Sequence, residues 1–361
     1  MYSREVAMGI NDCLQKMIED NASDLHIKAG EIPRYRVGKR LIPFGPPLPK
    51  EHVLKWLTER IDQSRAERLK EKGEIDFAFT FNNWRFRANA YFERQRLCMA
   101  IRKIPSGNIT IAELNLPPVV EKLANERRGL ILVTGTAGSG KSTTLAAIIN
   151  KINETRECHI VTIEDPIEIV HEDKKAFVTQ REISVDTESF AEALRHVVRQ
   201  DPDVIMVGEM RDRETVEAAI SAAEMGNLVL STLHTVDAAE TVNRIIDFFQ
   251  PHEQKQVRIS LAAVLKGVIS QRLLPSTKGG LVPAVEILIC TKTVQDYIVN
   301  PDETHKIKEV IETGEYYGMQ SFEQSLMKLY MAGLIDLEEA AAASKNAEDF
   351  KIRLRQQGIA V

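Results

Sequence analysis

The sequence Gly135-Thr136-Ala137-Gly138-Ser139-Gly140-Lys141-Ser142 decides how this chain folds, because it is a complete G-x-x-x-x-G-K-S phosphate-binding loop. The apolar run at 130–133 before it predicts a buried strand, and the run at 143–149 after it predicts a helix. In that context the backbone N–H groups of the turn converge on phosphate oxygens. The sequence therefore predicts a nucleotide-binding domain built around this turn.

The candidates for binding the nucleotide, which we expect to be ATP, run from the second loop position to the first residues of the helix. They are Thr136, Ala137, Gly138, Ser139, Gly140, Lys141, Ser142 and Thr143. Lys141 is expected to reach the β- and γ-phosphates as a point charge, and Ser142 is expected to ligate Mg²⁺.

Strands and helices alternate after the loop, which predicts a parallel sheet. A later pair of strands is expected around 268–274 and 282–289. Closer to the loop, strands are expected at 160–163, 204–207 and 228–232, and helices at 188–199 and 212–225. Glu164, Glu209 and His234 stand at or just after the carboxyl ends of these three strands. Ligands bind at that edge of such sheets, so these side chains are candidate catalytic residues.

ATP hydrolysis needs a metal ion, a group that orients the attacking water and positive charge near the γ-phosphate. Glu209 ends an apolar strand, as a Walker B carboxylate does, but the usual preceding Asp is replaced by Gly208. We therefore expect Mg²⁺ to be held by Ser142 and Glu209, partly through water. Glu164 and Glu209 both remain candidates for the general base. The alternative is that each carboxylate only caps the next helix and that His234 is structural.

Residues 1–103 predict a small α+β domain. A helix is expected at 4–20, strands at 23–27 and 34–37, a proline-rich connector at 43–49, and a helix at 50–71 broken near Asp62. Alternating polarity predicts a hairpin of 75–81 and 84–91 around Asn82-Asn83, followed by a strand at 96–103. The hairpin region carries several arginines, which are either solubilising or available to a triphosphate as arginine fingers. These arginines are Arg85, Arg87, Arg94, Arg96 and Arg102.

Four segments are expected along the chain. They are the α+β domain at 1–103, a linker at 104–119 containing Pro105 and Gly107, the nucleotide-binding core at 120–290 and a helical region at 291–361. The 361 residues carry a formal net charge of −5, which divides into +5 for 1–115 and −10 for the rest. An acidic main body argues against nucleic acid as the primary partner. No membrane-length run, signal-like segment or metal-spaced cysteine pair is present, so we expect a cytoplasmic protein with free thiols.

With these elements in order, the sequence resembles the secretion ATPases of the type II and type IV pilus superfamily, and within it the PilT-like pilus retraction ATPases. The matching segments are the phosphate loop, an acidic box at 163–168, a Walker B segment at 201–212 and a histidine box at 231–235. Further matches are the segments at 23–27, 85–89, 268–275 and 318–322. A glycine before the Walker B glutamate is usual in this family.

The resemblance implies a RecA-like P-loop core with a parallel sheet, a PAS-like α+β domain before it and a helical region after it. It implies Mg²⁺-dependent ATP hydrolysis by a homohexameric motor that drives type IV pilus retraction and twitching motility. The implied catalytic residues are Glu164, Glu209, His234, Arg87, Arg94, Arg96 and Arg102. The implied partners are the inner-membrane platform protein of the pilus machine and a paralogous ATPase, which would hold the protein at the inner membrane.

Three alternatives stay open. An accessory pilus or type II secretion ATPase is one, because the A-I-R-N-L signature of retraction ATPases is replaced by Lys306-Ile307-Lys308-Glu309-Val310. A nucleic-acid translocase is the second, supported by the basic hairpin alone. A regulatory nucleotide-binding module without turnover is the third, and the presence of Glu164, Glu209 and His234 argues against it.

Overall fold

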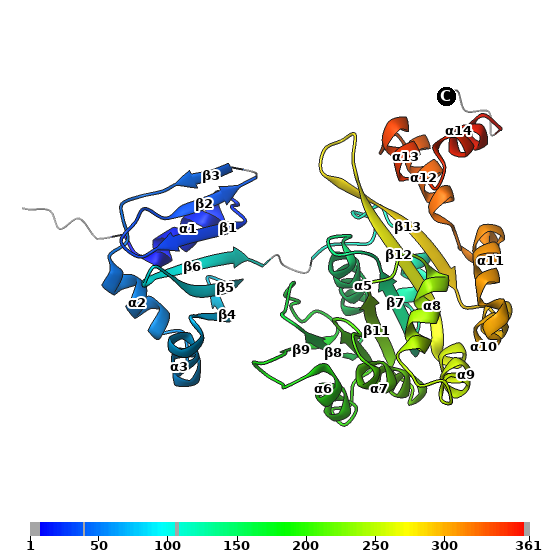
Figure 1. Ribbon diagram of the computed structural model, residues 1–361, viewed down its shortest axis with the longest axis horizontal. Coiled ribbons are helices and arrows are strands. Elements are labelled where there is room, and N and C mark those ends of the chain that lie inside the picture. Colours follow the sequence, from blue (N-terminus) through cyan, green and yellow to red (C-terminus); the bar gives the residue numbers. More distant parts are fainter. Residues whose placement is uncertain (1–7, 39, 105–107, 357–361) are drawn as a thin grey trace, which may run out of the picture. The chain divides into compact units, whose positions relative to one another are not determined.

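The computed structural model describes residues 8–38, 40–104 and 108–356. The chain divides into two compact units, Met1–Ser106 and Gly107–Val361 (Figure 1). Pro105 and Gly107, two residues of the expected linker, lie outside the described residues, as do positions 4–7 of the first expected helix.

Within residues 8–38 and 40–104, the first unit is an antiparallel six-stranded sheet in the order β3-β2-β1-β6-β5-β4, with three helices. Its elements are α1 (Ile10–Glu19), β1 (Asp24–Lys28), β2 (Arg34–Val37), β3 (Arg40–Pro43), α2 (Lys50–Thr58), α3 (Gln63–Lys72), β4 (Glu74–Phe81), β5 (Trp84–Glu93) and β6 (Arg96–Lys103).

Alternation along β5 explains how this sheet is packed. Phe86, Ala88 and Ala90 are completely buried in the core of the unit, whereas Arg87 is exposed. The turn Asn82-Asn83 has φ values of 47° and 62°, which asparagine tolerates and a two-residue hairpin turn requires. The break predicted near Asp62 is also present, because the Asp62 carboxylate accepts from the Arg65 N–H and caps α3.

The second unit contains a seven-stranded sheet in the order β13-β12-β7-β11-β10-β8-β9, in which the β12–β13 pair alone is antiparallel. Its strands are β7 (Gly129–Thr134), β8 (His159–Glu164), β9 (Phe177–Glu182), β10 (Val204–Val207), β11 (Leu228–Leu233), β12 (Leu265–Pro275) and β13 (Leu281–Ile289). Its helices through α9 are α4 (Val119–Ala124), α5 (Lys141–Thr155), α6 (Phe190–Val197), α7 (Arg213–Glu224), α8 (Ala238–Asp247) and α9 (Gln254–Val264).

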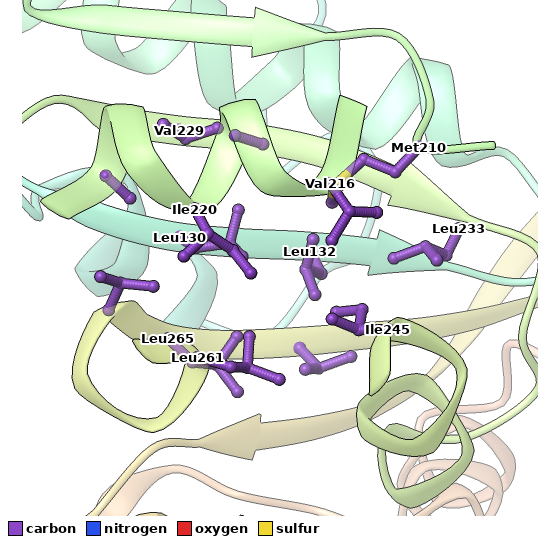
Figure 2. Packing of buried hydrophobic residues seen from close by; sticks show 14 of the residues in the cluster. Leu130, Leu132, Met210, Val216, Ile220, Val229, Leu233, Ile245, Leu261 and Leu265 are labelled. Carbon is purple, nitrogen blue, oxygen red and sulfur yellow. The ribbon is translucent and has the colours of Figure 1, made fainter. Parts of the chain in front are cut away.

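The central strands of this sheet are apolar on both faces. Leu130 and Leu132 of β7 pack in one cluster with side chains from α7, α8 and α9, as Figure 2 shows. Ile131 and Val133 of the same strand pack in a second cluster with α4 and α5. Burial on both faces is why these strands read as continuous apolar runs, and it is the arrangement expected of a parallel sheet.

The last part of the described chain is a series of helices. These are α10 (Lys292–Val299), α11 (Ile307–Thr313), α12 (Phe322–Met331), α13 (Leu337–Ala343) and α14 (Ala347–Gln356), with short 3₁₀ segments at Pro301–Lys306 and Glu315–Tyr317. Side chains of α12, α13 and α14 pack with Leu274 and Val282 from the far end of the β12–β13 hairpin. This small core is distinct from the two clusters that cover the sheet.

Two strands are missing from the sequence prediction. β3 ends at Pro43, the first residue of the expected proline-rich connector, and β9 forms the sheet edge beside β8. All of β3 is exposed, and β9 is mostly half-buried and polar, so neither shows a core-facing pattern. All four cysteines are free, and among the described residues no helix is long and apolar enough to cross a membrane.

Candidate active site

The phosphate loop connects β7 to α5. The backbone turns at Gly138 and Gly140, whose φ values of 77° and 89° lie in the left-handed region that other residues enter only at a cost. Lys141 is the first residue of α5, so the loop leads directly into a helix N-terminus. This geometry aims backbone donors and the positive end of the helix at one place, which suits a phosphate group.

Lys141 lies against the loop. Its ammonium donates to the carbonyl oxygens of Gly135 and Thr136, each at 2.9 Å. Burial lowers the pKa of Lys141, and the carboxylates of Glu209 and Glu168 act in the opposite direction. Lys141 thus lies against the loop and within electrostatic reach of the acidic side chains of the cleft.

A cleft of about 250 Å³ joins the loop to the ends of three strands. The expected site residues that line it are Ala137, Gly138, Lys141, Ser142, Glu164, Glu209 and His234. Thr136 and Ser139 face a neighbouring hollow beside Arg272 of β12, which Ala137 and Gly138 also line. Gly140 and Thr143 line neither space. Expected residues that are more than 90 positions apart in sequence therefore meet in one cleft.

Glu164, at the end of β8, is buried with a relative exposure of 7%. Its Oε1 accepts from the hydroxyl of Thr162 at 2.7 Å and from Nε2 of Gln180 at 3.0 Å. Burial raises the pKa of Glu164, the nearby Glu168 carboxylate adds to the rise, and the hydrogen bonds reduce it. A carboxyl group with a raised pKa suits proton transfer near neutral pH.

Glu164→Gln is expected to raise the thermal unfolding midpoint at pH 8 by about 2–4 °C, with a smaller gain at pH 5. An acid whose pKa is raised by folding holds its proton more tightly in the folded state. Stability is then lost as the pH rises from the unfolded pKa through the folded pKa, and glutamine removes that loss. Thermal unfolding at the two pH values measures it. Glu154→Gln, at the surface of α5, is the control, and an equal gain at both pH values would contradict the pKa argument.

Glu209 is held on both carboxylate oxygens. Oε1 pairs with the guanidinium of Arg211, and Oε2 lies 3.5 Å from Nε2 of His234. Arg211 also lies 4.0 Å from the Asp165 carboxylate, and the Glu209 pair raises the pKa of Arg211. Arg211 was not singled out from the sequence, although it stands two residues after the Walker B glutamate.

Gly208 lies where the ends of β8 and β10 approach each other. A Cβ on Gly208 would be 3.4 Å from the Ile163 carbonyl oxygen and 3.6 Å from the Glu164 Cα. An aspartate here would add a second carboxyl group beside the buried Glu164. The glycine therefore keeps a further carboxyl group away from Glu164.

Two further side chains that support the site come from distant segments. Gln180 of β9 donates to Glu164, and Gln271 of β12 contacts the phosphate loop. Gln180 lies on a strand that the sequence did not predict. Gln271 falls within the 268–275 segment, but nothing in its local pattern shows that it meets a loop 130 positions earlier.

The five expected arginines belong to the first unit, and all of them lie on the β5–β6 hairpin. Arg87 and Arg102 are register partners on the exposed face of the sheet, and Arg94 lies in the turn with a φ of 50°. Arg102 pairs with Asp24 at 2.7 Å, Arg96 pairs with Glu31, and Arg87 lies 4.0 Å from Asp76. The pairs of Arg87 and Arg96 are exposed on both sides and are therefore weak, so either guanidinium can exchange its carboxylate for a phosphate at small cost, whereas the Asp24 side chain that pairs with Arg102 is only 12% exposed.

The oxygen donors around Ser142 suit Mg²⁺. Ser142 is exposed on the cleft, and Glu209 lies on the same cleft with a side chain that is 14% exposed. Over residues 8–38, 40–104 and 108–356, no three His, Cys, Asp or Glu side chains gather to hold a metal. A hydroxyl, one carboxylate and substrate phosphates fit Mg²⁺, which keeps several waters and seldom uses an all-protein cage.

Comparison with known proteins gives consistent matches along nearly the whole chain. Residues 3–350 match the family model described as type II/IV secretion system protein. The type IV pilus retraction ATPase PilT of Pseudomonas aeruginosa is 42% identical over 345 residues, which cover 95% of this chain and 100% of that protein. A twitching motility protein of Neisseria gonorrhoeae is 45% identical over 84% of this chain and 81% of its own length.

A solved structure agrees with these matches. The crystal structure of the pilus retraction motor PilT with bound ADP superposes with a TM-score of 0.86 and 43% identity. The match covers 96% of this chain and 99% of that one. The α/β core, the antiparallel first unit and the C-terminal helices therefore share one fold with that motor.

Proposed function

The chain belongs to the type II/IV secretion system protein family, and from this we propose that it is an ATPase motor that drives type IV pilus retraction and twitching motility. The observation that carries the proposal is the match to PilT over 95% of this chain and the whole of that protein. The cleft supports it, because it combines a phosphate loop with Glu164, Glu209 and His234.

The residues of the cleft divide the work of hydrolysis among them. The loop N–H groups and Lys141 bind and orient the β- and γ-phosphates of ATP. Glu164 or Glu209 holds the attacking water and takes its proton, and His234 keeps the Glu209 carboxylate in place. Ser142 and Glu209 would hold Mg²⁺, partly through water, and the bound ion would supply positive charge that neutralises the phosphates.

The first unit would supply further positive charge. In this proposal one or more of Arg87, Arg94, Arg96 and Arg102 act on the phosphates as arginine fingers. The working assembly is a homohexamer at the inner membrane, attached to the platform protein of the pilus machine and joined there by a paralogous ATPase. Residues 1–103 are the arginine-bearing domain, 104–119 the linker, 120–290 the catalytic core and 291–361 the helical region.

Two measurements test the proposal. The purified protein should release phosphate from ATP in the presence of Mg²⁺, and phosphate release should stop when EDTA removes the metal. A strain that lacks the gene should make pili but lose twitching, and the gene supplied in trans should restore it. Absence of ATP hydrolysis would overturn the enzymatic part, and normal twitching in the deletion strain would overturn the role as the main retraction motor.

A further inference from the structure

Gln271 of β12 bridges two parts of the nucleotide-binding motif. Its Nε2 donates to the carbonyl oxygen of Ser139 at 2.7 Å, and its Oε1 accepts from the hydroxyl of Thr144 at 2.8 Å. Only the nitrogen end of the amide can serve a carbonyl oxygen, so these partners fix the orientation of the amide. Gln271 and Thr144 are 3% and 1% exposed, which places both hydrogen bonds away from water.

Two glycines of the motif lie so close to Gln271 that a side chain at either position would clash with it. A Cβ on Gly135 would lie 2.4 Å from the Gln271 carbonyl oxygen, and a Cβ on Gly140 would lie 2.7 Å from its Nε2. The loop therefore begins and ends in close contact with Gln271. Glycine is required at both positions for this packing as well as for the positive φ values of 148° and 89°.

The position of Gln271 along the sheet explains how it reaches the loop. Ser270 pairs with Thr134, the last residue of β7, so Gln271 lies one residue beyond the end of that strand pairing. Its side chain thus reaches the loop just where β7 stops supporting it. Gln271 binds the turn at the Ser139 carbonyl, which lies between Gly138 and Gly140, both with positive φ.

We infer that Gln271 is a positioning residue for nucleotide binding. It holds the phosphate loop in the conformation that binds phosphate, without contacting the phosphates itself. The inference rests on the proposed function. A loop that is fixed at Ser139 and at the first turn of α5 presents its N–H groups in one arrangement. Without the bridge, part of the binding free energy must be used to order the loop.

Gln271→Met tests the inference, because methionine fills a similar volume and makes neither hydrogen bond. The affinity for Mg-ADP, measured by isothermal titration calorimetry, is expected to fall about 10- to 100-fold, since a buried carbonyl and a buried hydroxyl lose their partner. Thr144→Val removes one of the two bonds and should lower the affinity less. The double variant should fall short of the product of the two single effects, because both act on one network.

Ser270→Ala is the matched control. It removes the fully buried 2.9 Å hydrogen bond between Ser270 of β12 and Thr134 of β7. The hydrogen bonds of the neighbouring Gln271 to Ser139 and Thr144 remain. Its affinity for Mg-ADP should stay within about twofold of the wild type even if its unfolding midpoint falls. An equal loss of affinity in Ser270→Ala would reduce Gln271 to a general packing role and overturn the inference.

The remaining outcomes are also decisive. Wild-type affinity in Gln271→Met would overturn the inference, and if that variant does not fold, wild-type affinity in Thr144→Val would do the same. Failure of the wild-type protein to bind Mg-ADP or hydrolyse ATP would instead overturn the proposed function. The two failures are thereby distinguished by the behaviour of the unsubstituted chain.

Discussion

Replacing Lys141 by alanine is expected to reduce ATP turnover by about 10³-fold or more, because the reaction then lacks its fixed cation on the β- and γ-phosphates. The Lys141 ammonium is already placed by two loop carbonyls at 2.9 Å, so little rearrangement separates it from a phosphate. The fold should survive, since the loss of two hydrogen bonds at the loop costs only about 1–3 kcal/mol. A phosphate-release assay and circular dichroism measure the two expectations.

Lys151→Ala provides a matched control on the same helix. Lys151 pairs with Glu121 at 3.1 Å on a partly exposed surface, and it does not line the cleft. Turnover in this variant should stay near that of the wild type. If Lys141→Ala hydrolyses ATP within about tenfold of the wild type, the assignment of the phosphate site is wrong.

Glu209→Gln is expected to lower kcat by about 10²- to 10³-fold while KM for ATP changes little. The carboxylate is held by Arg211 and His234, so an amide of nearly the same shape leaves its placement intact but removes its charge. A loss in kcat alone is the sign of a contact made mainly in the transition state. Steady-state kinetics over a range of ATP concentrations separates kcat from KM.

Comparison with two other glutamates identifies the base. Glu217→Gln, on the exposed surface of α7, should leave kcat unchanged. Glu164→Gln should lower kcat as well if the buried carboxyl takes the proton of the attacking water. A larger fall in kcat for Glu164→Gln than for Glu209→Gln would make Glu164 the general base. If kcat falls in neither variant, neither glutamate is the general base.

The sequence was most informative where local pattern and tertiary environment agree. β7, β10 and β11 are buried on both faces, so their apolar runs predict strands without knowledge of their neighbours. The turn at Asn82-Asn83 was predictable for a similar reason, because the required positive φ values select the residue type. Local chemistry alone determines these features.

The features that were not predicted depend on long-range contacts. β9 is an edge strand whose half-exposed Thr179 and Gln180 give no periodic apolar signal, yet Gln180 supports Glu164. Gln271 is an ordinary polar residue in sequence, and its role arises only when β12 brings it to the loop. Arg211 is close to Glu209 in sequence, but no local pattern shows that its guanidinium turns back onto that carboxylate. Gln271 and its partner Ser139 are 132 positions apart, so no short stretch of sequence contains both.

The separate cores of the two units have a calorimetric consequence. One cluster of described residues, from Ile10 to Ile101, lies wholly in the first unit, and the other three lie wholly in the second. Two independent cores should give two heat-absorption peaks on unfolding, and ATP should shift only the peak of a unit that binds it. A shift confined to the second peak would leave Arg87 and Arg102 without a role in binding, whereas a shift of both would mean that residues of both units bind the nucleotide.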